Sequence, residues 1–129
     1  MNMKLNYIVF CDSASIDTSG KVNLIGIFDR IQSSQFPTSV PLMQIATEVM
    51  DVTDENLNIK ILVTKKDSNE VVAEVETIQK MNLANGDRYR LLAKADSMIF
   101  PEPGDYNVLV DINGEKFMAP SPLKVVAIS

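Results

Sequence analysis

The sequence predicts an all-β fold: a two-sheet, immunoglobulin-like sandwich of about seven to nine mainly antiparallel strands. Three observations lead to this prediction. Apolar and polar residues alternate with a period of two along several segments. Turn-forming residues separate these segments at fairly even intervals. No segment carries a convincing amphipathic helical pattern. We expect residues 1–129 to form a single β-sandwich domain, long enough to bury a core without disulfides.

Two hairpins are predicted most clearly. Leu57–Thr64 and Val71–Glu76 both alternate, and the polar stretch Lys65–Glu70 between them predicts a turn. Tyr106–Ile112 also alternates, and Asn113-Gly114 follows at once. Asn-Gly after an alternating strand is a strong hairpin signal, because both residues tolerate positive φ. The other strands are expected at Leu5–Cys11, Val22–Phe28, Pro41–Met50, Arg88–Asp96, Glu115–Met118 and Leu123–Ile128.

The first half of the chain is more apolar than the second. Leu5–Cys11 and Val22–Phe28 are near-continuous apolar runs, which predicts strands that are central in their sheet or covered on both faces. Asp17–Gly20 supplies the turn between them. Gly26 predicts a bulge or a close backbone approach. Two short segments are ambiguous: Asp29–Gln35 is compatible with a single helical turn, and Thr77–Leu83 with either a strand or a short helix.

Prolines mark the end of the predicted sheet. Pro120 and Pro122 interrupt the return strand Glu115–Met118, which suits an edge position or a switch between sheets, because proline has no N–H to donate. An exposed edge near Met118 is able to pair with a partner's strand.

Composition restricts the function classes. The net charge of −5, from 17 acids and 12 bases, disfavours nucleic-acid binding, because an acidic surface repels phosphates. There is no histidine, and Cys11 is the only cysteine, so an intramolecular disulfide is excluded. A lone thiol fits a reducing compartment. No window has the apolar length of a signal peptide or a membrane helix. We therefore expect a cytoplasmic protein with no membrane partner.

The segment Phe100–Tyr106 resembles the tyrosine corner of immunoglobulin-like sandwiches, in which the phenol binds a nearby backbone group. Antibody domains have a cysteine two residues after this tyrosine, where this chain has Val108. The chain also has no tryptophan. The similarity is therefore to the general sandwich, and it gives Tyr106 a structural role.

Two sets of charged residues are candidates for ligand binding. Acidic residues gather in predicted loops, where they suit either a hard cation or ordinary solvated turns. The three arginines suit either an anion-binding group or ion pairs at strand ends, and Arg88 and Arg90 are expected to share the solvent face of one strand. The candidates are Asp51, Asp54 and Glu55, then Asp67 and Glu70, then Asp111 and Glu115, and the arginines Arg30, Arg88 and Arg90.

Nothing in the sequence points to catalysis. Cys11, Ser13 and Ser15 lie close together, but a nucleophile needs a base beside it, and histidine is absent. No Gly-x-Ser-x-Gly elbow, Ser-x-x-Lys motif or glycine-rich phosphate loop occurs. We assign no catalytic, cofactor-binding or metal-ligating residue and expect no cofactor.

Segments at both ends of the chain resemble a family of uncharacterised small all-β bacterial proteins. The resemblance lies in Phe10–Asp12, Val22–Pro37 with Gly-Ile-Phe-Asp, Phe100–Tyr106, Asn113-Gly114 and Pro122–Val125. It implies a small all-β domain with no assigned activity, so no functional residue carries over.

Three hypotheses follow from the sequence. The leading one is a non-enzymatic interaction module, which binds an unknown protein partner or itself through a sheet face, an edge strand or loops. The alternative is a small-ligand or metal-ion binding domain that uses the loop carboxylates or Arg30, Arg88 and Arg90. The third is a hydrolase without histidine, which needs a pocket holding two convergent titratable groups.

Overall fold

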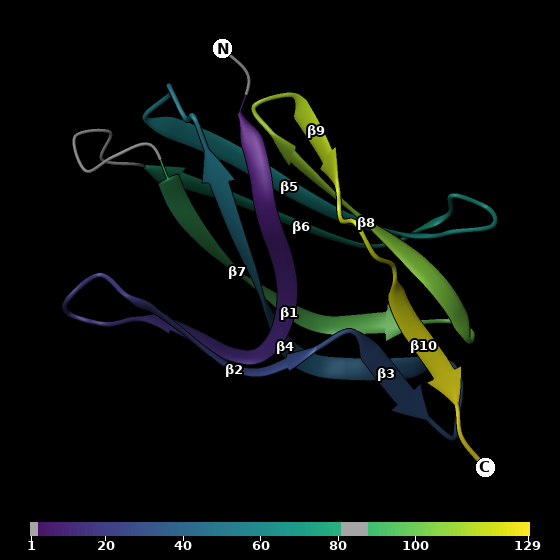
Figure 1. Ribbon diagram of the computed structural model, residues 1–129. Coiled ribbons are helices and arrows are strands. Elements are labelled where there is room, and N and C mark those ends of the chain that lie inside the picture. The colour runs from purple at the N-terminus through teal and green to yellow at the C-terminus, as the bar shows by residue number, and fades with distance from the viewer. Residues whose placement is uncertain (1–2, 81–87) are drawn as a thin grey trace.

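The computed structural model describes residues 3–80 and 88–129, and these residues form an all-β structure with no helix. Ten strands build a four-stranded and a six-stranded sheet (Figure 1). No helix long and apolar enough to cross a membrane occurs in this part of the chain. The strands are β1 (Lys4–Ile16), β2 (Val22–Phe28), β3 (Arg30–Ser33), β4 (Thr38–Met50), β5 (Asn56–Lys65), β6 (Val71–Lys80), β7 (Arg88–Phe100), β8 (Gly104–Ile112), β9 (Glu115–Met118) and β10 (Leu123–Ala127).

The four-stranded sheet has the order β2-β1-β4-β7, and the six-stranded sheet has the order β3-β10-β8-β5-β6, with β9 also paired to β8. β3 and β10 pair in parallel, whereas the other pairings within the described ranges are antiparallel. The mainly antiparallel prediction is therefore confirmed. Only Asp29 separates β2 from β3, so the chain passes from one sheet to the other at this residue.

A single core of buried side chains lies between the two sheets. Alternating residues of β7 face it, as the sequence pattern predicts: Tyr89, Leu91, Ala93 and Ala95 are all buried. From the opposite sheet, β5 and β8 contribute side chains at every second position, all branched aliphatic except Tyr106. Burial of apolar area is the main stabilising term in folding. The core residues from the two central strands of the six-stranded sheet are Leu57, Ile59, Ile61, Val63, Tyr106, Val108, Val110 and Ile112.

Both predicted hairpins are present. β5 and β6 pair along their length, and β8 and β9 pair across the Asn113-Gly114 turn. Asn113 has φ of 53° and Gly114 has φ of 90°, which is the conformation that this dipeptide favours. The Asn113 side chain also ties the turn to β5, because its Oδ1 accepts a hydrogen bond from the Asn58 N–H at 2.8 Å.

Several expected elements differ from the structure. Arg30–Ser33 is strand β3 rather than a helical turn, because it pairs in parallel with β10. Thr77–Lys80 is strand, and the rest of the ambiguous segment Thr77–Leu83 lies outside the described residues. β4 begins at Thr38, three residues before Pro41. Ten strands occur where about seven to nine were expected, partly because the passage between the sheets at Asp29 makes β3 a strand of its own.

β2 is an edge strand, which corrects the prediction of a central or doubly covered strand. It pairs only with β1 within the described ranges. Ile25 and Ile27 are 64% and 60% exposed. An apolar run predicts coverage, but coverage depends on which neighbours the fold supplies, and the sequence pattern does not specify them.

β1 is central in its sheet but changes partners along its length. Residues Lys4–Cys11 pair with β4, and Phe10–Ile16 pair with β2. In the part of β1 that no longer pairs with β4, a side chain supplies the hydrogen bond instead. The Gln44 Oε1 accepts a hydrogen bond from the Ala14 N–H. β1 bends sharply in this region, and the β1–β2 hairpin, which is part of the four-stranded sheet, extends to the left in Figure 1.

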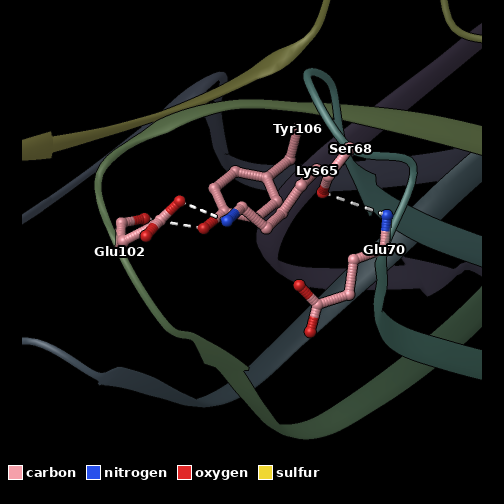
Figure 2. Close-up of polar contacts among 5 residues, drawn as sticks. All are labelled: Lys65, Ser68, Glu70, Glu102 and Tyr106. Atoms are coloured by element: carbon pink, nitrogen blue, oxygen red, sulfur yellow. Dashed lines mark hydrogen bonds and ion pairs between the residues drawn. The ribbon is translucent and has the colours of Figure 1, made fainter.

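Tyr106 forms the predicted corner at the start of β8. Its hydroxyl donates a 2.6 Å hydrogen bond to the Glu102 carbonyl, and its ring packs edge-on against Phe100 with the ring centroids 5.1 Å apart. Figure 2 shows the Glu102 carboxylate bound to the Lys65 ammonium, so the same loop residue also holds the β5–β6 turn. Within that turn, the Ser68 hydroxyl accepts the Glu70 N–H at 3.3 Å.

The first prediction concerns this corner. Tyr106→Phe keeps the ring and removes the hydroxyl, leaving the Glu102 carbonyl without its donor, so we expect the free energy of unfolding to fall by about 1–2 kcal/mol. Urea denaturation measures this loss. A variant as stable as the wild type would contradict the structural role of the hydroxyl.

The same variant gives a pH test. Burial raises the pKa of the Tyr106 phenol, so the unfolded chain loses this proton at a lower pH than the folded chain. The contribution of the neutral phenol is fully present below pH about 10 and is lost as the pH rises through the folded-state pKa. We expect the stability difference between wild type and Tyr106→Phe to shrink above pH 10.

The second prediction concerns Gly26 of β2, which lies close to Asp12 of β1. Gly26 has φ of +70°, and a Cβ at this position would lie 2.8 Å from the Asp12 Cγ, on the opposite strand. Gly26→Ala therefore adds a clash to the backbone strain. Gly20→Ala is the matched control, because Gly20 has φ of +86° with no atom near the added Cβ. We expect Gly20→Ala to cost about 1 kcal/mol and Gly26→Ala more. Equal losses in urea denaturation would show that Asp12 does not restrict this position.

Candidate functional site

The three nucleophile candidates all lie on β1 but differ in exposure. Cys11 is fully buried, and its Sγ lies 3.5 Å from the Gln44 carbonyl, to which the thiol donates. Burial raises the pKa of this thiol, and the nearby Asp12 carboxylate raises it further, so the thiolate is disfavoured. Ser13 and Ser15 lie on the exposed part of the β1–β2 hairpin.

The loop carboxylates do not gather into a cation site. Within residues 3–80 and 88–129, no group of three or more acidic, cysteine or histidine side chains is placed to hold a metal ion. Asp54 instead accepts a 3.3 Å hydrogen bond from the Asn113 amide, and Asp111 accepts the Gly114 N–H at 2.8 Å. These carboxylates stabilise turns.

Glu115 differs from the other acids of the loops. It begins β9 opposite Ile112, whose side chain is buried in the core. Its Oε2 is buried and has no hydrogen-bond partner among the described residues. A buried carboxylate oxygen without a donor costs free energy, so this atom favours an incoming N–H or cation.

The structure separates the three arginines. Arg88 and Arg90 lie on β7, while Arg30 lies on β3 of the other sheet. The Arg90 Nε contacts the Glu48 Oε1 at 2.9 Å, and the Glu48 Oε2 accepts a 3.0 Å hydrogen bond from the Asn6 amide. Arg90 therefore meets an acidic neighbour on β4, as expected, whereas Arg88 forms no ion pair within the described ranges. Arg30 forms no ion pair within the described ranges.

A residue that the sequence analysis overlooked joins the β7 arginines. Lys21, in the β1–β2 turn, lines a cavity of about 360 Å³ together with Arg90 and Glu48. An adjoining cavity of about 490 Å³ is lined by Arg88 and Arg90 and shares Ser19, Gly20 and Val22 of the hairpin with the first. We call these two cavities the cationic groove. The bend of β1 brings the hairpin beside the β7 arginines and so forms the groove. No local sequence pattern predicts that these distant segments lie together.

A second hollow with mostly apolar lining borders the middle of β1. A cavity of about 360 Å³, here called the edge slot, separates the β1–β2 corner from the segment Ala119–Leu123. Its polar side chains are those of Asp29 and Ser121. The other lining residues are Ile8, Val9, Phe10, Ile27, Phe28, Ala119, Pro120, Pro122 and Leu123. Pro120 and Pro122 were the residues by which the sequence analysis drew attention to this part of the molecule.

Strand edges without neighbours flank the edge slot. β2 pairs with β1 only from Phe10 onward, so Lys4–Val9 have β4 on one side and no strand on the other within the described ranges. β9 pairs only with β8 in the same part of the chain. The predicted edge near Met118 is therefore confirmed, and Met118 is 57% exposed.

No curated protein matches this chain. A family model does match it, over residues 6–126, and its description is a family of unknown function, DUF6941. This range contains the edge slot and the cationic groove. Because the model covers nearly the whole sequence, the chain belongs to the family of unknown function DUF6941.

Proposed function

We propose that this protein is a non-enzymatic binding module that captures an extended segment of a protein partner in the edge slot. The observation that carries the proposal is the free backbone edge of Lys4–Val9 beside an apolar cavity. The partner segment would add a strand next to β1, along the line that β2 occupies farther on. Its apolar side chains would enter the slot.

Backbone chemistry supports an extended occupant. In an antiparallel strand, alternate residues direct their N–H and C=O groups to opposite sides. About half of these groups in Lys4–Val9 therefore point away from β4, where an added strand would satisfy them. Six residues of strand span roughly 20 Å, so the edge accommodates a segment of about six residues.

Side chains around the slot support an apolar partner. Ile8, Phe10 and Phe28 line the slot, and Ile27 lies at it with most of its side chain exposed. Burial of apolar area drives most protein association.

Other features of the proposal extend the sequence expectations. We propose that the two sheets form an immunoglobulin-like sandwich, which the Tyr106 corner supports, and that the chain acts as one domain. The buried Cys11 thiol and the dispersed carboxylates fit a module without catalysis. The lone cysteine and the acidic composition fit a cytoplasmic protein that binds no nucleic acid.

The third prediction tests the slot with two isoleucines of the same strand. Seven-residue peptides would be selected from a random displayed library against the wild type. Ile27→Asp places a charge at the slot, whereas Ile25→Asp changes an equally exposed residue that does not line it. We expect Ile27→Asp to weaken the selected peptides at least tenfold, about 1.4 kcal/mol, and Ile25→Asp to leave their affinity unchanged.

Hydrogen exchange locates the bound peptide. We expect amides within Lys4–Val9 to exchange more slowly in the complex, because an added strand would accept hydrogen bonds from them. Equal weakening by both aspartate variants would contradict the proposal. So would unchanged exchange in Lys4–Val9, or a library selection that enriches no peptide.

A further inference from the structure

We propose that the cationic groove is a binding site for an amphiphilic anion, a molecule with one carboxylate or phosphate group on an apolar body. This site is separate from the edge slot and does not depend on the proposed function. It lies between the tip of the β1–β2 hairpin and the start of β7, and Figure 1 shows both elements projecting on the same side of the molecule.

The charge balance of the groove is opposite to that of the whole chain. The net charge of the protein is −5, but the groove lining holds three cations, Lys21, Arg88 and Arg90, and one acid, Glu48. Glu48 is only 7% exposed and already binds Arg90 and Asn6. A local excess of positive charge in a concave surface attracts anions.

The contact with Glu48 orients the Arg90 side chain through its Nε atom. Glu48 engages the Nε atom, and no second ion pair engages the terminal nitrogens of Arg90 within the described ranges. These nitrogens form the fork that suits a planar carboxylate or a phosphate. Asn6 holds the second Glu48 oxygen at 3.0 Å, which restricts the carboxylate that orients the arginine. Arg88 forms no ion pair in this part of the chain.

Two other acids near the groove, Asp17 and Asp51, do not line it and form no ion pair with its cations within the described ranges. The Asp17 Oδ1 accepts hydrogen bonds from the Ser19 and Lys21 N–H groups, each at 2.9 Å, and from the Ser19 hydroxyl at 2.7 Å. Its carboxylate therefore closes the hairpin turn, and these hydrogen bonds lower the pKa of Asp17. Asp51 follows Met50, which pairs with Arg88, but it does not line the groove and forms no ion pair with Arg88.

Apolar residues of the groove specify the rest of the ligand. Val22 lines both cavities, and Leu24 and Ile16 each line one of them. Ile16 is 54% exposed, so a ligand that covers it removes apolar surface from water. A small inorganic anion would leave this surface exposed, and a neutral apolar molecule would leave the cations unpaired. The groove suits a ligand that has both parts.

The experiment titrates the 129-residue protein with four probes: octanoate, octyl phosphate, octanol and inorganic phosphate. Backbone amide NMR shifts of the hairpin and of β7 report on binding. We expect saturable shifts with octanoate or octyl phosphate, and at least tenfold weaker responses to octanol and to inorganic phosphate. The relative affinity of the two amphiphiles shows whether the groove prefers a carboxylate or a phosphate. Binding should also weaken as the salt concentration rises.

Three variants make the test specific. Lys21→Gln combined with Arg88→Gln removes two cations that hold no ion pair, so the fold should be retained, and we expect at least a tenfold loss of octanoate affinity. Arg30→Gln is the matched control, since it removes a β3 arginine outside the groove, and it should bind as the wild type does. Val22→Ser should weaken octanoate more than inorganic phosphate.

Three results would overturn the proposal. One is equal affinity for octanoate and octanol, which would show that charge is not recognised. Another is an equal loss of binding in Arg30→Gln and in the double variant, which would indicate a diffuse charge effect. The third is the absence of any saturable shift in the hairpin or in β7.

Discussion

The change of partners along β1 is the constraint on which the other surfaces depend. The first half of the strand pairs with β4 and the second half with β2, and the two pairings overlap only at Phe10 and Cys11. Among the described strands, each half therefore lacks a neighbour on one side. The free side of the first half borders the edge slot, and the projecting second half carries the hairpin that lines the cationic groove. One strand thus produces two hollows of different chemistry.

The parts of the fold that the sequence predicted are those that local physics determines. The strand Tyr106–Ile112, its Asn113-Gly114 turn and the corner at Tyr106 were expected from alternation, positive φ and a short-range hydrogen bond. The buried face of β7 followed from a period of two. In each case the residues that decide the structure lie within a few positions of one another.

The parts that the sequence did not predict depend on contacts between distant segments. The apolar residues of β2 resembled a buried strand, yet Ile25 and Ile27 are exposed, because the fold gives β2 only β1 as a neighbour among the described strands. Alternation placed Arg88 and Arg90 on one face, but only the bend of β1 brings Lys21 to them, and Arg30 lies on the other sheet. Which residue supplies the third cation of the groove therefore depends on the tertiary fold and not on a local sequence pattern.

The edge slot is built from opposite ends of the chain. One wall comes from Ile8–Phe10 and Ile27–Asp29, and the other from Ala119–Leu123. A molecule bound there would contact the first and last quarters of the sequence at once. It would therefore hold these two segments together. Proteolytic nicking near either terminus would then proceed more slowly in the complex than in the free protein, and a fragment that lacks residues 119–129 would lose one whole wall of the slot.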